Sequence, residues 1–504
     1  MDVAQLGSGD YVIAGAGTLR IEGTRDFDKT ISGAGTFDTS GAITFSGDAR
    51  AHTGTTKVED GSLTIAQGAL LGTGAFDVAG TLVLIGDRTF ENATSGTGTV
   101  DVASGNLTVT KNVGTATLHI SSGASATFAG TSDGFSGKLT GAGALTTTQN
   151  FEVSGDASGF SGKTSVTAGT FTVSESAKLG SGAFDIAGTL ALNGDRTLAN
   201  ETSGDGTIEI FSGATTFTTD VGTKTLSVAQ GASATLNAGV DLTHANAEAQ
   251  IAGTLNLSGM RVLAAQMSGN GTIVLKRGSD VSFTQSVGVK TLSVENGATL
   301  RGNVSLIHGA DAELSLAGTL VVNADKGEKV ALGGGKAVLA NTATLDLIGN
   351  GVAARASSVE IQRLETGEEV TIFEGGSVLG DVVSFLKTDD DLSAYATDYA
   401  VVYDTTGGLS VQVVKSAELD ASSVKMPDGW QDAFDVLTSG FTANYKAGFY
   451  SKSELENAGF DTSDPLVHAI LTNPESARDM AMNILPGHYA AVVAMKAEAF
   501  YSDV

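Results

Sequence analysis

The chain has no cysteine, and its 504 residues include only four prolines and one tryptophan. Without cysteine, no disulfide can staple the fold. Because proline is so rare, almost every backbone amide is free to donate a hydrogen bond, as stacked strands require. Aromatic residues make up only 6% of the chain, which suits an interior too narrow for many rings. These absences favour a repetitive β-structure over a small disulfide-linked domain.

Positive charge is also scarce, with 29 lysines and arginines against 56 aspartates and glutamates and a net charge of −27. A chain this acidic, with no basic cluster, is repelled by phosphate backbones and anionic lipid, so we expect no nucleic-acid partner. No run of 18 apolar residues exists, so no helix is expected to span a bilayer. We interpret the charge as an aid to solubility, and cation binding remains the alternative.

What the chain does have is an internal repeat. The phrase Gly74-Ala75-Phe76-Asp77 returns further along the chain as Gly182-Ala183-Phe184-Asp185. The phrase Ala-Gly-Thr-Leu begins at positions 79, 187, 252 and 317, in steps of 108, 65 and 65. A unit of about 21 to 22 residues accounts for every step, and that length predicts one coil of a three-sided β-solenoid.

The residues within the unit agree with this prediction. Short apolar or alternating segments end at glycine, asparagine, aspartate or serine, as strands followed by turns do. Leu82, Leu190, Leu255 and Leu320 occupy one place in the unit, so we expect them to form one buried column, with Leu84, Leu192, Leu257 and Val322 two positions on. The 67 glycines are expected at corners where φ is positive.

The pattern changes toward the C-terminus, and three segments follow. Residues 1–384 are predicted to form the parallel β-helix, and residues 385–415 a C-terminal β cap with a hairpin over 399–403 and 409–413. Residues 416–504 are predicted to form a mixed linker. Within it, Asn473-Pro474 starts a helix to Leu485, and helical sequence resumes from Tyr489 to Tyr501.

Several phrases resemble a known family. Gly33-Ala34-Gly35-Thr36-Phe37 and Gly61-Ser62-Leu63-Thr64-Ile65, with their copies from Gly141 onward, resemble the autotransporter-associated β-strand repeat. The tail from Ala481 to Ala490 resembles the segment that joins an autotransporter passenger to its outer-membrane barrel. The repeat resemblance covers residues 15–340, and the linker resemblance covers about thirty residues. The resemblance implies a right-handed parallel β-helix secreted through a C-terminal β-barrel and displayed outside a Gram-negative cell.

This chain departs from the full family pattern because it lacks a signal peptide and barrel strands. We therefore expect it to be the passenger and its linker alone, with the outer-membrane β-barrel translocator as a partner. The absence of cysteine fits a chain that must stay free of disulfide cross-links while it crosses a second membrane.

Two motifs superficially suggest chemistry. Residues 157–164, ending in Gly162-Lys163-Thr164, resemble a phosphate-binding loop, but Ala157 replaces its first glycine and no helix follows. Asp156-Ala157-Ser158-Gly159 resembles a serine nucleophile motif, yet a serine needs a base and an orienting acid. The six histidines form no such pattern; they are His52, His119, His244, His308, His468 and His488. We interpret both motifs as turns.

The sequence also predicts no metal site. Residues 389–391 are three consecutive aspartates, and Asp26 and Asp28 lie close together, but neither group matches a calcium loop. No histidine pair has zinc-ligand spacing. Phe76 and Phe184 recur in register and are expected to fill the core. The sequence therefore predicts no catalytic residue, no cofactor and no metal site.

The hypothesis from sequence is a non-enzymatic, surface-displayed structural or adhesive protein. It would bind host or bacterial surface ligands or itself, in cell adhesion, self-association or biofilm formation, through many weak polar contacts along a repetitive face. Two alternatives remain. One is an enzyme acting on surface polysaccharide, and the other is a passive spacer for a missing N-terminal element.

Overall fold

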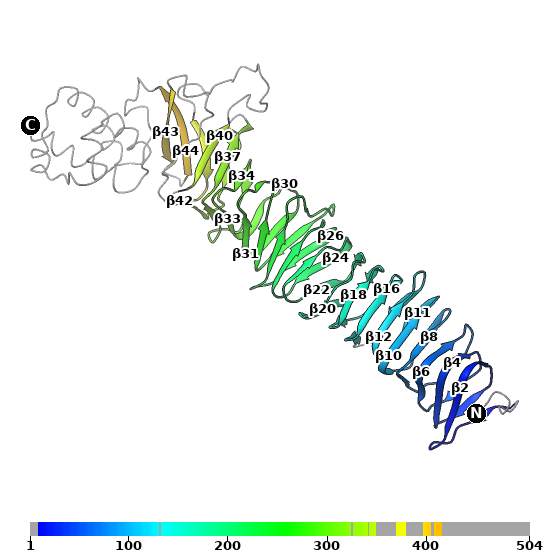
Figure 1. Ribbon diagram of the computed structural model, residues 1–504. Coiled ribbons are helices and arrows are strands. Elements are labelled where there is room, and N and C mark those ends of the chain that lie inside the picture. Colours follow the sequence, from blue (N-terminus) through cyan, green and yellow to red (C-terminus); the bar gives the residue numbers. More distant parts are fainter. Residues whose placement is uncertain are drawn as a thin grey trace, which may run out of the picture. The chain divides into compact units, whose positions relative to one another are not determined.

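The computed structural model describes residues 9–130, 133–323, 326–340, 342–348, 369–379, 397–404 and 408–415. These parts contain strands and no α-helix, and the parallel strands stack as a β-solenoid of about 17 turns (Figure 1). The predicted all-β parallel fold is confirmed. Contacts divide the chain into two units, Met1–Thr235 with Val240–Gln250, and Leu236–Gly239 with Ile251–Val504.

The first unit is built from stacks of short parallel strands. One stack contains β2 (Thr18–Phe27), β4 (Thr36–Phe45), β6 (Thr56–Ile65), β7 (Phe76–Val78), β8 (Thr81–Leu84), β10 (Thr94–Val102), β12 (Val113–Ile120), β15 (Lys138–Gly141) and β18 (Asp156–Phe160). A second contains β9 (Arg88–Phe90), β11 (Asn106–Val109), β13 (Ser125–Phe128), β16 (Ala144–Thr147), β19 (Thr164–Val166) and β21 (Phe184–Ile186). A third contains β14 (Asp133–Phe135), β17 (Phe151–Val153), β20 (Thr170–Val173), β22 (Thr189–Leu192), β24 (Thr202–Ile210) and β26 (Thr223–Val228).

Shorter strands complete this part of the chain. They are β1 (Tyr11–Val12), β3 (Ile31–Gly33), β5 (Ala51–His52), β23 (Arg196–Leu198), β25 (Ala214–Phe217), β27 (Ser233–Leu236) and β28 (Glu248–Ile251). Over residues 138–173 each turn takes one strand from each of the three stacks, because β15, β16 and β17 pair with β18, β19 and β20 of the next turn.

The second unit repeats the same arrangement. One stack contains β29 (Thr254–Leu257), β31 (Gln266–Leu275), β33 (Val287–Val294), β36 (Glu313–Leu316), β39 (Lys336–Leu339) and β42 (Ser377–Leu379). Another contains β30 (Met260–Leu263), β32 (Asp280–Phe283), β34 (Thr299–Arg301), β37 (Thr319–Asn323) and β40 (Thr344–Ile348). The remaining strands are β35 (Val304–Ser305), β38 (Val330–Ala331), β41 (Glu369–Glu374), β43 (Thr397–Asp404) and β44 (Gly408–Lys415).

The core is the inward face of these strands. Alternate residues point inward, as period-2 geometry requires, and most of the inward residues are apolar, with a minority of buried threonines such as Thr147 and Thr215. Leu82, Leu190, Leu255 and Leu320 are each 0% exposed. Phenylalanines stack from turn to turn, with the Phe151 and Phe171 ring centres 5.7 Å apart. Phe76 and Phe184 are buried, so their predicted place in the core is confirmed.

The predicted coil length is wrong, because a turn takes roughly 19 residues and not 21 to 22. The strand pairing shows why: one column of paired residues runs Ile43, Leu63, Leu82, Val100, Leu118 and Leu139, which is five turns. Phe151, the counterpart of Ile43 in the next copy of the long repeat, lies on β17 in a different stack. The long repeat is therefore not a whole number of turns.

The 65-residue step between copies of Ala-Gly-Thr-Leu is also not a whole number of turns. Leu255, Ile273, Leu292 and Leu314 form one column over three turns, whereas Leu320, the counterpart of Leu255 in the next copy, lies on β37 in another stack. The single column predicted for Leu82, Leu190, Leu255 and Leu320 is therefore wrong, although all four face inward. Like residues recur on successive sides of the solenoid.

Glycine allows the turns to stack closely at the corners. Gly269 has a φ of +123°, and a Cβ atom there would lie 2.2 Å from the carbonyl oxygen of Ile251 in the turn below. Only glycine meets both the backbone conformation and the close approach. The predicted use of glycine at corners with positive φ is confirmed at this position and at others like it.

The chain beyond the stacked coils is described in part. β43 and β44 form an antiparallel hairpin with Tyr399 opposite Val413, as the sequence predicts, and β44 also pairs antiparallel with β41. The role of residues 385–415 as a cap stays a prediction. The linker predicted for 416–504 and its helices lie outside the described residues.

Candidate functional site

The segment that resembles a phosphate-binding loop is a strand, a turn and a strand. Gly162 packs against the turn below, where a Cβ atom would lie 1.6 Å from the carbonyl oxygen of Gly143. The Lys163 ammonium pairs with the Asp185 carboxylate at 2.7 Å, and the Thr164 side chain is buried. No helix N-terminus follows these residues to hold a phosphate. The interpretation of this motif as a turn therefore agrees with the structure.

The prediction that the serine motif is a turn is wrong, because Asp156, Ser158 and Gly159 lie on strand β18. The Ser158 hydroxyl donates to the Asp156 carboxylate at 2.5 Å, and the Ser158 amide donates to the same oxygen at 2.9 Å. Asp156 thereby stabilises the stretch of β18 where its pairing with β15 shifts register, and these bonds lower the pKa of Asp156. Neither contact involves a histidine that would activate Ser158.

The described histidines lie in separate surroundings. The His119 ring contacts Thr140 Oγ1 at 2.9 Å. The His244 ring contacts Asp205 Oδ1 at 3.0 Å, and the His308 ring contacts Gly288 O at 3.3 Å. His52 is buried, and neither of its ring nitrogens has a hydrogen bond within normal geometry. His468 and His488 lie outside the described residues. His119 lies in register between Asp101 on β10 and Thr140 on β15, and the Asp101 carboxylate accepts from the Ser121 hydroxyl at 3.4 Å.

The acidic pairs proposed from sequence do not combine into a metal site in the described part of the chain. The Asp28 carboxylate pairs with the Lys29 ammonium at 3.0 Å, which lowers the pKa of Asp28. Across the described ranges, no group of three or more histidine, aspartate or glutamate side chains is arranged to hold an ion. Residues 389–391 fall outside those ranges.

A charged cluster instead links three turns near the start of the solenoid. The Arg20 guanidinium on β2 contacts Asp38 on β4 at 2.7 Å and Glu59 on β6 at 2.6 Å. Asp38 is only 5% exposed, and burial, reinforced by the Glu59 carboxylate, raises the pKa of Asp38 even though Arg20 opposes the shift. Arg20 also contacts the Glu22 carboxylate at 2.6 Å, so its single positive charge offsets part of the repulsion among three carboxylates and links the three turns.

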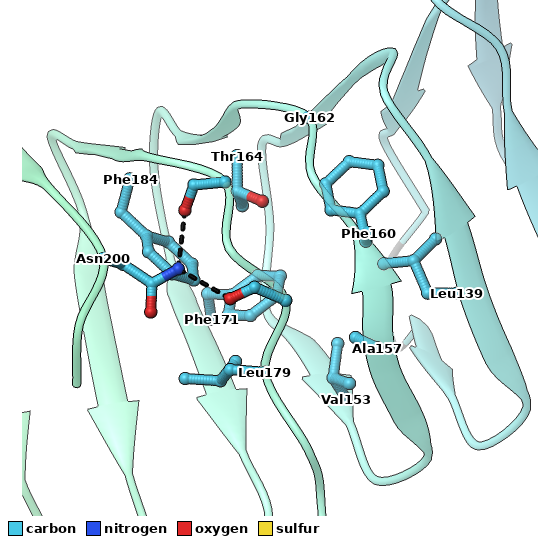
Figure 2. A pocket seen from close by; sticks show the side chains of 12 residues that line it. Leu139, Val153, Ala157, Phe160, Gly162, Thr164, Phe171, Leu179, Phe184 and Asn200 are labelled. Carbon is cyan, nitrogen blue, oxygen red and sulfur yellow. Dashed lines mark hydrogen bonds between the residues drawn. The ribbon is translucent and has the colours of Figure 1, made fainter. Parts of the chain in front are cut away.

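Buried asparagines form a feature that sequence reasoning missed. The Asn200 amide donates to the carbonyl oxygens of Gly180 at 2.8 Å and Gly182 at 2.7 Å, in the turn below (Figure 2). Asn92, its counterpart in the preceding copy of the long repeat, makes the same pair of bonds to Gly72 and Gly74. Each asparagine satisfies carbonyls at a corner where the backbone makes no strand.

The space beside Asn200 is too small for a ligand. Phe160, Phe171, Phe184 and Thr164 surround a cavity of about 20 Å³, which Figure 2 shows within the core. That volume holds about one water molecule. The cavity is therefore a packing defect of the solenoid, and not a substrate or cofactor site.

Inward-turned arginines are a second missed feature. Arg88, Arg196 and Arg261 recur in step with the repeated phrases, and each guanidinium donates to backbone carbonyls of its own turn and of the turn before. Arg196, for example, contacts Ser174 O at 2.9 Å and also Asn193 O. Burial lowers the pKa of Arg88 and of Arg196. The recurring Gly-Asp-Arg-Thr phrase was the available signal, but it does not reveal which carbonyls lie nearby.

The outward side of the solenoid carries columns of hydroxyl groups. On β9, β11, β13, β16 and β19 the paired outward residues are Thr89, Thr108, Thr127, Thr146 and Ser165. Side chains on one flank bond along the stack, since Asn106 donates to Asp87 and Ser125 donates to Asn106 at 2.7 Å. We name the outward surface of these five strands the hydroxyl face.

Similar columns occur elsewhere. Thr170, Thr189, Thr207 and Thr225 pair on successive strands of the first unit, as do Thr254, Thr272 and Thr291 in the second. In-register hydroxyls repeat at the strand spacing of about 4.8 Å. Such columns offer hydrogen bonds at regular intervals, which suits contact with another repetitive surface.

Two further observations bear on function. The described segments contain no helix long and apolar enough to cross a membrane. Comparison with family models, with curated proteins and with solved structures gives no match.

Proposed function

We propose that this chain is a β-solenoid passenger displayed at the surface of a Gram-negative cell, where it acts as a structural and adhesive protein. One observation carries the proposal: outward hydroxyl columns run in register along both units. The resemblance of residues 15–340 to autotransporter-associated repeats supports the cellular setting.

The physical basis is the sum of many weak contacts. One hydrogen bond at an exposed surface contributes only about 0.5–1.5 kcal/mol. A column that repeats the same donor and acceptor in each turn lets a partner with a matching repeat form many such bonds at once. Contacts linked in this way raise the overall affinity far above that of any single one.

The route to the surface is the second part of the proposal. An outer-membrane β-barrel would be the translocator, reached through residues 416–504. The hairpin of β43 and β44 would close the last turn, where antiparallel pairing with β41 covers a strand edge. Host or bacterial surface molecules, or other copies of the chain, would be the ligands.

The test is display of the full chain on a non-adhesive Gram-negative host, joined to an outer-membrane anchor. We expect the cells to settle and to adhere to surfaces faster than cells that carry the anchor alone. A panel of surface polysaccharides incubated with the purified chain should release no reducing ends. Hydrolysis without adhesion would favour the enzyme, and neither activity would favour the spacer.

A further inference from the structure

One exposed turn of the solenoid carries an asparagine followed by a glycine. Such a pair can cyclise, because glycine has no side chain to hinder the attack of its backbone nitrogen on the asparagine side-chain carbon. The sequence has four of these pairs, which begin at Asn193, Asn270, Asn296 and Asn350. Asn350 lies outside the described residues. Burial and hydrogen bonding distinguish the other three.

Asn296 and Gly297 lie in the turn between β33 and β34 (Figure 1). Both residues are exposed, and Gly297 has a φ of +80°. The Ala298 amide donates to the Glu295 carbonyl at 2.9 Å and closes the turn. Within the described part of the chain, neither the Asn296 side chain nor the Gly297 amide has a hydrogen-bond partner. The two groups that would react are therefore open to water and unrestrained.

The pair at Asn193 is held by the neighbouring turns. The Asn193 side chain is half-buried and donates to the Val173 carbonyl at 3.2 Å. The Gly194 amide, which would have to attack, donates to the Ser212 hydroxyl at 3.3 Å. Both bonds have to break before the amide nitrogen can reach the side chain, so we expect this pair to react only after local opening.

The pair at Asn270 is held by the strand in which it lies. Asn270 is exposed, but it belongs to β31, and the backbone of the following residue packs closely on the turn below. A Cβ atom on Gly271 would lie 2.2 Å from the carbonyl oxygen of Gly253. The backbone therefore cannot rotate toward the Asn270 side chain without breaking up the stack.

The turn of Asn296 recurs in the solenoid with glutamine in place of asparagine. Gln67-Gly68 and Gln230-Gly231 are exposed, each turn is closed by a backbone hydrogen bond, and the two glycines have φ of +84° and +83°. Glutamine is longer by a methylene, so the same attack would form a larger ring, which closes more slowly. Among the described residues, only Asn296 combines the reactive pair with this open turn.

We propose that Asn296 is a site of spontaneous deamidation in the folded chain. The Gly297 nitrogen bonds to the Asn296 side-chain carbon, the proton of that nitrogen leaves with the side-chain nitrogen as ammonia, and a cyclic imide remains. Water then adds to one of the two imide carbonyls and opens the ring. Cleavage at the side-chain carbon yields aspartate, and cleavage at the main-chain carbon yields isoaspartate. This modification goes beyond the proposed function and does not depend on it.

The modification changes the charge and the backbone of the turn. Either product adds a carboxylate next to Glu295. Isoaspartate also lengthens the main chain by one methylene, which disturbs the bond from the Ala298 amide to Glu295 and the bond from the Gly278 amide to the Gly297 carbonyl at 2.8 Å. We expect the Ala298 and Gly278 amides to lose hydrogen-exchange protection in the isoaspartyl form and to keep it in the aspartyl form.

The experiment incubates the purified, folded full chain in mildly alkaline buffer made with water enriched in the heavy oxygen isotope. Peptides are then prepared in ordinary water and analysed by mass spectrometry. We expect heavy oxygen at Asn296, in both aspartyl and isoaspartyl products, more than about tenfold faster than at Asn193 or Asn270, because those pairs must open first.

Two variants serve as matched controls. Asn296→Gln should abolish the labelling and leave the circular dichroism spectrum unchanged, because glutamine already occupies the same turn at Gln67 and Gln230. Gln230→Asn should create a new site that is labelled at a rate similar to that of Asn296, because it places asparagine before an exposed glycine in the same kind of turn.

Four results would overturn the proposal. Asn296 could take up no heavy oxygen in the folded chain, or all three described pairs could react equally, so that the fold selects none of them. An aspartyl product without isoaspartate would mean that water attacks the side chain directly and that the Gly297 nitrogen takes no part. A Gln230→Asn chain that is folded but unlabelled at that position would show that the open turn does not permit the reaction.

Discussion

Replacing Asn200 by alanine should destabilise the turns around it by about 2–6 kcal/mol, because it leaves two buried acceptors without a donor. The substitution removes the amide that donates to the Gly180 and Gly182 carbonyls, at 2.8 and 2.7 Å, in a side chain that is 5% exposed. Each buried acceptor left without its donor costs about 1–3 kcal/mol, which gives that range for two. Water that enters the enlarged cavity would place the result toward the lower end.

The assay should report on local stability, because each turn of a solenoid contacts only its neighbours. Native-state hydrogen exchange can follow the amides of β19, β21 and β22. A loss of about 2 kcal/mol in local opening free energy lowers their protection by roughly 30-fold. Amides of β2 and β4, many turns away, should keep their wild-type protection.

Asn150 is the control for Asn200. Its side-chain oxygen accepts a bond from the Thr170 amide at 3.0 Å, but the residue is exposed, so water replaces it after Asn150→Ala. That change should cost less than about 1 kcal/mol. If Asn200→Ala and Asn150→Ala lower protection equally, the buried amide does not stabilise the corner and the reasoning is refuted.

Three further predictions concern the core, a buried histidine and a corner. Leu190→Asp buries a carboxylate at a 0% exposed position and should lower the free energy of unfolding, measured in urea, by several kcal/mol. Thr189→Asp, on the outward side of the same strand, should lower it only slightly. Equal losses would contradict the assignment of Leu190 to the inward face and Thr189 to the outward face. Burial lowers the pKa of His52 below 6.5, so the unfolded chain binds the proton first. Stability should therefore fall as the pH drops below about 6.5 and stay level above it, and His52→Phe should remove that acid slope in melts at about pH 5 and pH 8; an unchanged slope would exclude His52 as its cause. Gly269→Ala should lower the melting temperature more than Gly278→Ala. Both glycines have positive φ, but only at Gly269 would the new Cβ atom meet backbone, at 2.2 Å. Equal losses would mean that the backbone around Gly269 shifts to make room for the Cβ atom.

The direction in which each strand side chain points could be read from the sequence. Alternation places Leu82 and Leu84 inward on β8 with Thr81 and Val83 half-exposed, and the structure agrees. A pattern with period 2 acts within one strand, so it needs no knowledge of the neighbouring turns. The recurring phrases likewise indicated a stack of similar coils, and the hairpin of β43 and β44 followed from two strand patterns around a glycine turn.

The number of residues per turn was decided only by tertiary structure. Repeats count positions along the chain, whereas stacking depends on where the chain closes a turn, and one copy of the long repeat does not close a whole number of turns. Leu82 and Leu320 are alike in sequence context but lie in different stacks.

The same reason explains what the sequence did not reveal about the surface and the corners. Asn200 bonds to carbonyls 18 and 20 positions earlier, and Thr127 joins the hydroxyl face because the register between turns places it beside Thr108 and Thr146. Such partners are set by where each turn closes. The sequence by itself determined the residue types and the inward or outward direction of their side chains, and only the stacking decided which of them meet.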